Sequence, residues 1–361
     1  LYNNNTGSSN SAMGVNALYS NTYGNNNIGN GCRALMCNTT GSNNIAQGFC
    51  ALWNNTTGSD NIGMGYQALV NNVWGFSNIA QGYKTLYNNS TGAFNVGVGS
   101  CALYSNTAGN GNISIGSYSM VSNTTGSYNV AIGYSLLYKN SIGSNNVAFG
   151  NQALYCNTTG NYNTAIGYLA LYNNSYGVNN FAQGYKALYC NTSGNSNIAQ
   201  GYKALYCNKN GNNNIAIGCC SLTNTLCSGN IGIGYSTLYA NNNGFSNVAV
   251  GTYALAYNTC GNGNVGIGCN ALAYNTTGCN NVAIGYNPLQ SNSFGSENIG
   301  IGYSSLSSNC AGCSNVALGR LALFSNSFGS NNNAQGYRAL WNNTSGNNNI
   351  AVGYNALYNN T

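Results

Sequence analysis

The sequence predicts an all-β protein, a parallel β-solenoid of about 21 rungs with seventeen residues in each. Three observations support this fold class. A glycine recurs every seventeen residues from Gly14 and Gly31 to Gly353, with one sixteen-residue step from Gly218 to Gly234. Each repeat contains one short β-branched segment, flanked by an invariant Asn position and a nearly invariant Leu position. Because a unit this short cannot bury a core alone, it must stack on copies of itself.

Positions within the repeat are counted from the turn glycine, for example Gly7 or Gly24, so that the recurring glycine stands at position 8. Position 5 is nearly always Ile or Val, and position 6 is only Ala, Gly or Ser. Positions 4 to 8 therefore predict a short strand. Alternation places positions 5 and 7 on one face and positions 4, 6 and 8 on the other. Both faces are restricted, so we expect the coil's interior on one side and a partner chain or second wall on the other.

Asparagine occupies position 4 in every repeat and recurs at position 15. Stacked rungs lie about 4.8 Å apart, so each column could form an amide ladder that bonds the rungs above and below. We favour the ladder at position 4, whereas at position 15 a ladder and a simple turn residue are equal alternatives. The position 4 ladder is represented by Asn10, Asn27, Asn44, Asn61, Asn78 and Asn349.

Position 12 is Leu in every repeat except at Met120, as in Leu18, Leu35 and Leu52. We expect this column to fill the core from a second extended segment at positions 9 to 13. The third side is an Asn-Thr-Thr-Gly turn. The single-residue deletion, between Cys219 and Cys227, falls in that turn and favours its exposure.

The residues needed for catalysis are almost absent. The chain has no His, and Asp60 and Glu297, its only carboxylates, are many rungs apart. Paired acid and base groups must lie close together, and serine has no histidine partner here. The pair Cys310 and Cys313 is an isolated CxxC, which is weak support for zinc. We therefore predict a protein that is not an enzyme and has no cofactor or metal.

Charged residues make up 3% of the chain, and the net charge of +6 comes from scattered residues. Nucleic-acid binding would need a basic stripe, and none is present. No segment approaches the roughly eighteen apolar residues of a membrane helix, so we expect no membrane insertion. Low charge leaves little repulsion between copies, so we expect either self-association or a glycan coat.

Cysteine is frequent, with fifteen residues. Cys190 and Cys207 share position 14 on adjacent rungs, which would place their Cα atoms roughly 5 Å apart, within bridging range. We predict a disulfide between them if the protein is extracellular.

The turns contain many N-x-S/T sequons. In a secreted protein they would be glycan acceptors on an exposed edge, and the alternative is that Asn-Thr-Thr-Gly is simply favourable turn chemistry. The Thr pairs also raise an ice-binding alternative, although Trp74 and Phe294 interrupt their columns. The candidate acceptors are Asn38, Asn55, Asn89, Asn123, Asn157, Asn191, Asn275 and Asn343.

Tyrosine recurs at positions 9 and 13, where stacked rings could bind carbohydrate; packing is the favoured interpretation. Gln at position 7 often accompanies Lys or Arg three residues later, as in Gln81 with Lys84 and Gln335 with Arg338. This covariation indicates either a hydrogen-bonded variant of the interface or a recent duplication of one unit.

The string Asn-x-Ala-Ile-Gly-Tyr-x-Ala-Leu stands at residues 163–171, and it recurs with Val for Ile at residues 349–357. It resembles repeats in the heads of bacterial trimeric autotransporter adhesins, and it is similar to Asn-Thr-Thr-Gly repeats of phage and giant-virus tail-fibre-like proteins. The resemblance covers the whole chain. It implies a left-handed parallel β-roll or β-solenoid that acts as an extracellular shaft or adhesive head, with no catalytic residue to carry over.

These observations predict a structural fibre or filament protein, extracellular or on a virion or cell surface, whose partners are identical chains. An adhesin or tail-fibre shaft that binds host glycans is the alternative, and an ice-binding solenoid is the second. We expect residues 1–361 to be one continuous array and an interior part of a longer one, because neither end has an atypical capping repeat.

Overall fold

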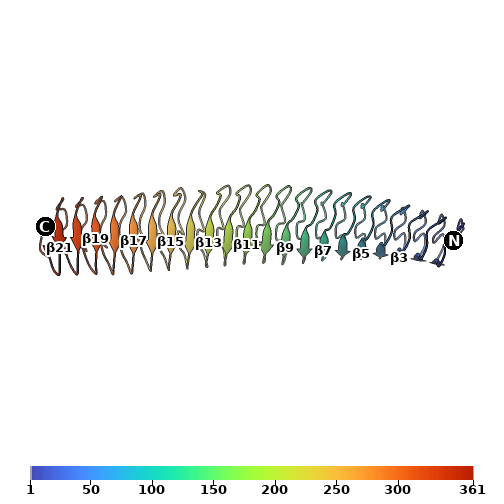
Figure 1. Cartoon of the computed structure of the whole chain (residues 1–361), viewed down its shortest axis with the longest axis horizontal. Helices are drawn as coiled ribbons and strands as arrows, with labels where there is room; N and C mark the ends of the chain where they lie inside the picture. Colours follow the sequence, from blue (N-terminus) through green and yellow to red (C-terminus); the bar gives the residue numbers. More distant parts are fainter. Residues whose placement is uncertain (1, 361) are drawn as a thin grey trace. The chain divides into compact units, whose positions relative to one another are not determined.

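The computed structural model describes residues 2–360 and shows the predicted parallel β-solenoid. The chain divides into two units, residues 1–179 and 180–361. In each unit three-residue strands stand side by side, one per repeat (Figure 1). The first unit contains β1 (Ser11–Met13), β2 (Ile28–Asn30), β3 (Ile45–Gln47), β4 (Ile62–Met64), β5 (Ile79–Gln81), β6 (Val96–Val98), β7 (Ile113–Ile115), β8 (Val130–Ile132), β9 (Val147–Phe149) and β10 (Thr164–Ile166).

The second unit repeats the same arrangement with one irregular rung. Its strands are β11 (Phe181–Gln183), β12 (Ile198–Gln200), β13 (Ile215–Ile217), β14 (Ile231–Ile233), β15 (Val248–Val250), β16 (Val265–Ile267), β17 (Val282–Ile284), β18 (Ile299–Ile301), β19 (Val316–Leu318), β20 (Asn333–Gln335) and β21 (Ile350–Val352). That residues 1–361 form one continuous array stays a prediction.

Neighbouring strands within a unit pair in parallel with a shift of one repeat. Ile45 is opposite Ile62 and Ala46 is opposite Gly63. Across the deletion the shift is sixteen residues, because Ile215 pairs with Ile231. The register is therefore set by the columns of the repeat, and the turn absorbs the missing residue.

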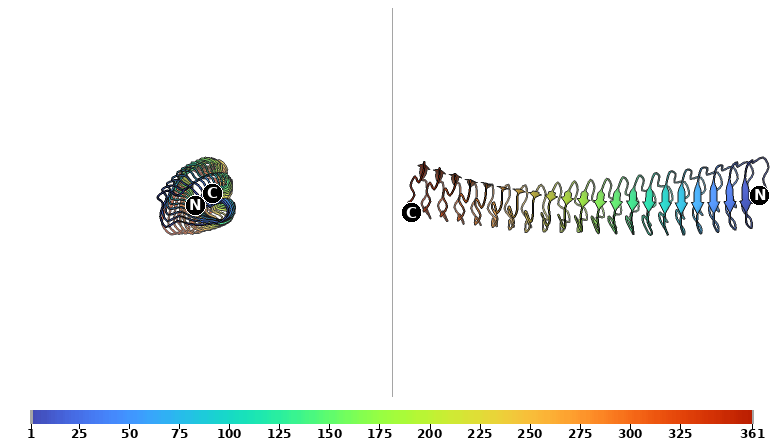
Figure 2. Two further views of the ribbon diagram at one scale, coloured as in Figure 1. Left: turned by 90° about the vertical axis from the view of Figure 1, so that its right-hand side faces the viewer. Right: turned by 90° about the horizontal axis from the view of Figure 1, so that it is seen from below.

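Backbone hydrogen bonds between rungs continue well beyond the strand. The Gly48 amide donates to the Asn30 carbonyl of the preceding rung at 2.9 Å, whereas the Leu35 amide donates to the Ala51 carbonyl of the next rung at 3.1 Å. Each rung is thus joined to both neighbours through its connecting segments, which project beyond the strands in Figure 2.

The expectation of a second extended segment at positions 9 to 13 was wrong. Positions 10 and 12 have left-handed backbone, for example φ 53° at Cys50 and φ 50° at Leu52. The Cys50 amide donates to the preceding rung and the Leu52 amide to the next rung, whereas the Ala51 amide between them donates to the Gly48 carbonyl of its own rung. The segment thereby curls around the core. Left-handed backbone at a non-glycine residue costs roughly 1–2 kcal/mol, which inter-rung hydrogen bonds and burial of the side chain offset.

The core of each rung is small and consistent along the chain. Position 6 points inward, so Ala46 and Ala80 are fully buried, and position 12 fills the remaining space with Leu18, Leu35 and Leu52, also fully buried. The leucine column therefore fills the core as predicted. Among residues 2–360 no helix is long and apolar enough to cross a membrane.

Candidate functional site

The position 4 asparagines form the predicted ladder. The Asn44 side-chain amide donates to the Asn27 Oδ1 at 3.1 Å and to the Gly58 carbonyl at 2.8 Å. The Asn44 Oδ1 accepts from the backbone and side-chain amides of Asn61 at 3.0 and 3.2 Å. Asn27, Asn44, Asn61 and Asn78 are fully buried, and Asn10 and Asn349 occupy the half-buried ends of the column.

At position 15 each asparagine with the bonds of Asn38 is both a ladder residue and a turn residue. The Asn38 side-chain amide donates to the Gly41 carbonyl of its own turn at 2.8 Å and to the Asn21 Oδ1 of the adjacent rung, also at 2.8 Å. The irregular rung interrupts this second ladder, because Thr225 replaces Asn. The Asn208 Oδ1 and the Thr225 Oγ1 are buried there without a hydrogen-bond partner.

The candidate glycan acceptors lie in this second ladder, so the expectation that these asparagines are exposed was wrong, although turn threonines such as Thr57 are exposed. Asn38, Asn55 and Asn123 have no exposed surface, and both hydrogens of each side-chain amide donate. An N-linked glycan replaces one of those hydrogens and needs solvent around it. Glycosylation and the ladder therefore exclude each other at the same residue. The remaining candidates are equally buried: Asn89, Asn157, Asn191, Asn275 and Asn343.

Positions 5 and 7 of every strand point outward and form the outer strand face. The side chains of Ile79 and Ile115 are 40% and 39% exposed, and Ile198 and Ile267 in the second unit are similar. No repeat has a charged residue at either position. Exposed apolar patches usually mark interaction sites. Position 5 is Ile or Val in most rungs, and position 7 is apolar in most rungs but Gln or Asn in others, so each unit has an uncharged and largely apolar stripe along this face.

Aromatic side chains stack along the rungs at positions 9 and 13. The rings of Tyr66 and Tyr83 have centroids 5.5 Å apart with an interplanar angle of 11°, and those of Tyr87 and Tyr104 are 5.0 Å apart with an angle of 8°. Position 9 rings are about half exposed, as at Tyr83. The rings pack on one another and still present one flank to solvent.

Cations at position 10 lie against these rings, a contact that the sequence reasoning missed. The Lys84 Nζ is 5.3 Å from the Tyr83 ring centroid and 5.5 Å from that of Tyr87. A hydrogen bond with Tyr83 is the main cause of a raised pKa at Lys84. The partner of the cation is thus aromatic, and the pattern Tyr-Lys-x-Leu-Tyr could have indicated it. Where the structure gives a position 7 glutamine a hydrogen bond, the partner is another amide. The Gln200 side-chain amide donates to the Gln183 Oε1 at 3.3 Å, and that of Gln335 donates to the Asn333 Oδ1 at 3.1 Å.

The thiols of Cys190 and Cys207 are free in the structure. Burial, and then the neighbouring Cys207, raise the pKa of the Cys190 thiol. The two side chains therefore interact across adjacent rungs, and the disulfide stays a prediction for an oxidising compartment. At the deletion the Sγ atoms of Cys219 and Cys220 are 3.5 Å apart.

The carboxylates act as local hydrogen-bond acceptors. Asp60 accepts from the Asn43 side-chain amide at 3.0 Å, and Glu297 accepts from the Ser314 hydroxyl at 3.2 Å. In the described part of the chain, no group of three or more Cys, Asp or Glu side chains could hold a metal ion.

Comparison with models of known protein families gives no match to this chain. Comparison with curated proteins gives none either.

Proposed function

We propose that this chain is a structural protein of extracellular or surface filaments, built by association of identical β-solenoid chains. The observation that carries the proposal is the outer strand face. A largely apolar surface, rich in Ile and Val, that runs along successive rungs without a charge is unusual on a protein that works alone.

The chemistry of this face favours a second copy of the chain as its partner. Opposed copies would present apolar columns with the same rung spacing of about 4.8 Å, so side chains from one copy could interdigitate with those of the other along many rungs. Such dry, repetitive interfaces stabilise fibrous assemblies. With charged residues at 3% of the chain, little electrostatic repulsion opposes the association.

A sedimentation-velocity experiment tests this proposal. The wild-type chain should associate as its concentration rises. In the I45K/I79K/I113K variant, three lysines on alternate rungs of the outer strand face should block association, because each buries a charge against an apolar surface. The matched control is T57K/T91K/T125K, which adds the same charge at the same spacing on exposed turn residues.

The control variant should associate like the wild type. Sedimentation of the wild type as a single chain at every concentration would refute the proposal. Equal association of the outer-face variant and the wild type would show that another surface is used.

The exposed tyrosine columns favour a second candidate function, recognition of surface glycans by an adhesin-like shaft. Saccharide rings stack on aromatic side chains, and Tyr66, Tyr83 and Tyr202 are each nearly half exposed. A glycan array separates the two functions. Specific binding that is lost on replacement of these tyrosines by Ala would support the adhesin, and absence of binding would leave the structural role.

A further inference from the structure

Cationic side chains of this chain lie against pairs of its own aromatic rings, and these contacts show how the chain can bind an ammonium group. The Lys203 Nζ lies 5.3 Å from the Tyr202 ring centroid and 5.7 Å from that of Tyr206. These distances are within the range of cation–π attraction. Lys84 makes the same pair of contacts, and Arg338 does so with a tyrosine and a tryptophan. The space between positions 9 and 13 therefore suits an organic cation.

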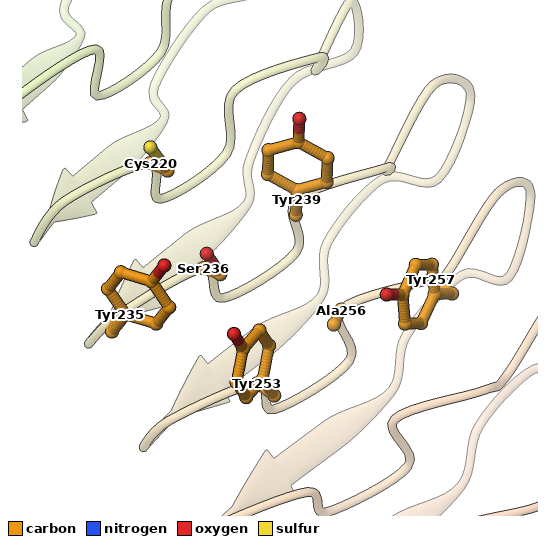
Figure 3. A pocket seen from close by; sticks show the side chains of 7 residues that line it. All are labelled: Cys220, Tyr235, Ser236, Tyr239, Tyr253, Ala256 and Tyr257. Carbon is orange, nitrogen blue, oxygen red and sulfur yellow. The ribbon is translucent and has the colours of Figure 1, made fainter.

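One rung keeps the same rings but has a small residue in place of the cation. Residues 235–239 read Tyr-Ser-Thr-Leu-Tyr, where residues 202–206 read Tyr-Lys-Ala-Leu-Tyr. The backbone is equivalent, with φ 50° at Ser236 and φ 51° at Lys203. The result is a groove of about 280 Å³, named here the Ser236 groove (Figure 3). Its lining residues are Cys220, Tyr235, Ser236, Tyr239, Tyr253, Ala256 and Tyr257.

The neighbouring rung completes the enclosure. The Tyr253 ring stands edge-on to Tyr235, with centroids 5.4 Å apart and an interplanar angle of 89°. Tyr239 and Tyr257 bound the opposite side of the groove in Figure 3. Four tyrosines thus surround a space with no cation among its lining residues.

The same substitution recurs in the first unit. Ser135 lies between Tyr134 and Tyr138 in a groove of about 380 Å³. There, however, the Lys139 Nζ is already 5.9 Å from the centroid of Tyr155, another lining ring. The resident charge would repel a second cation, so the Ser236 groove is the stronger candidate.

We propose that the Ser236 groove binds the primary ammonium group of a small alkylamine, in the place that a lysine side chain occupies on the Lys203 rung. The ammonium would lie against the faces of Tyr235 and Tyr239, and its alkyl chain would contact Ala256 and the neighbouring rings. Lys203 is two rungs away, about 10 Å, where salt screens its repulsion.

Saturation-transfer NMR with n-butylammonium as the probe and neutral 1-butanol as its isostere tests the proposal. Wild-type protein should bind butylammonium with a millimolar dissociation constant, and butanol at least fivefold more weakly. In S236K the new side chain should fill the groove and weaken binding at least tenfold. The matched control S236G keeps both the left-handed backbone and the open space, so it should bind like the wild type.

Because S236K could also lose binding through misfolding, a second variant that creates a groove is needed. K203S should open a second groove between Tyr202 and Tyr206 and raise the number of bound amines. Unchanged binding in S236K, or equal binding of butanol and butylammonium, would overturn the proposal. If S236K also lowers self-association of the protein, the natural ammonium is a lysine of a second copy; if it does not, the natural ligand is a free amine.

Discussion

Asn129 shows how one side chain holds three rungs together. Its two amides and its Oδ1 make five hydrogen bonds: its backbone and side-chain amides both donate to Asn112, its side-chain amide also donates to the Gly143 carbonyl, and its Oδ1 accepts from both amides of Asn146. The site is closed to solvent, so water cannot replace these partners.

We therefore expect N129A to be strongly destabilising. The substitution leaves several buried polar groups unpaired, at about 1–3 kcal/mol each, so the free energy of unfolding should fall by at least about 3 kcal/mol. Urea denaturation followed by circular dichroism measures the change. The control N151A removes an exposed asparagine and should change the free energy by less than about 0.5 kcal/mol. Similar losses in both variants would contradict the ladder's role.

The interrupted ladder offers the opposite test. T225N supplies a donor for the unpaired Asn208 Oδ1 and an acceptor for Asn241, whose side-chain amide donates to the Gly244 carbonyl. The variant should be more stable than the wild type by about 1 kcal/mol, measured by the same denaturation. A loss of stability would show that the shortened turn cannot place the amide in the ladder.

For single residues, the sequence predicted which positions form columns of one residue type along the stack. It was less successful at predicting whether a side chain in such a column is buried or exposed. Asn at position 4 and Leu at position 12 recur in nearly every copy, so their roles could be deduced. The burial of Asn38 and Asn55 could not be deduced, because Asn-Thr-Thr-Gly is also typical of a solvated turn. In this fold the turn asparagine points inward and bonds its own turn and the next rung.

At the scale of the element, the rung is a three-residue strand followed by a left-handed segment. Strand alternation was predictable from positions 5 to 7, but which face was interior was left open. The left-handed segment was not predictable, because Leu rarely adopts positive φ. Only the stacked neighbours, which accept and donate the redirected hydrogen bonds, make that backbone favourable at Leu35 or Leu52.

The glycine at position 8 ends each strand, and its substitution should be costly. Gly285 has φ +134°, and a Cβ there would lie 2.6 Å from the Gly302 carbonyl oxygen. G285A should lower the free energy of unfolding by at least about 3 kcal/mol, from backbone strain and the clash together. Thermal denaturation measures the effect.

Gly353 separates these two causes. It has a similar φ of +126° but nothing within 4 Å of the added Cβ. G353A should therefore show a smaller loss, about 1–3 kcal/mol from strain alone. Equal losses in G353A and G285A would mean that the contact between rungs adds nothing.

At the scale of the whole molecule, the scarcity of titratable groups predicts a flat pH profile. The chain has no His and two carboxylates, so the free energy of unfolding should change by less than about 1 kcal/mol between pH 5 and 8. Above about pH 9 it should fall under reducing conditions. Burial raises the thiol pKa of Cys37 and Cys156 above the ordinary 9.0, so the unfolded chain loses those protons first.

Urea denaturation at a series of pH values measures this profile. A steep change between pH 5 and 8 would contradict it, because it would require a titrating group that the fold does not contain. A rise in stability above pH 9 would contradict the thiol assignment.

The surface of the molecule is the feature that links the fold to its proposed role. The period of the repeat was enough to predict a stacked array, whereas low charge left self-association and a glycan coat as alternatives. The grooves between tyrosines could not be predicted from the sequence. Ser236 stands where Lys203 stands on another rung, and this difference indicates a groove only when the side chain at position 10 is known to lie between the rings at positions 9 and 13.

Negative-stain electron microscopy of the wild type beside I45K/I79K/I113K tests the central claim, assembly through the outer strand face, most directly. Wild-type protein should form long uniform filaments, and the variant should remain as single short particles. Single particles in the wild type, or identical filaments in both samples, would contradict the claim.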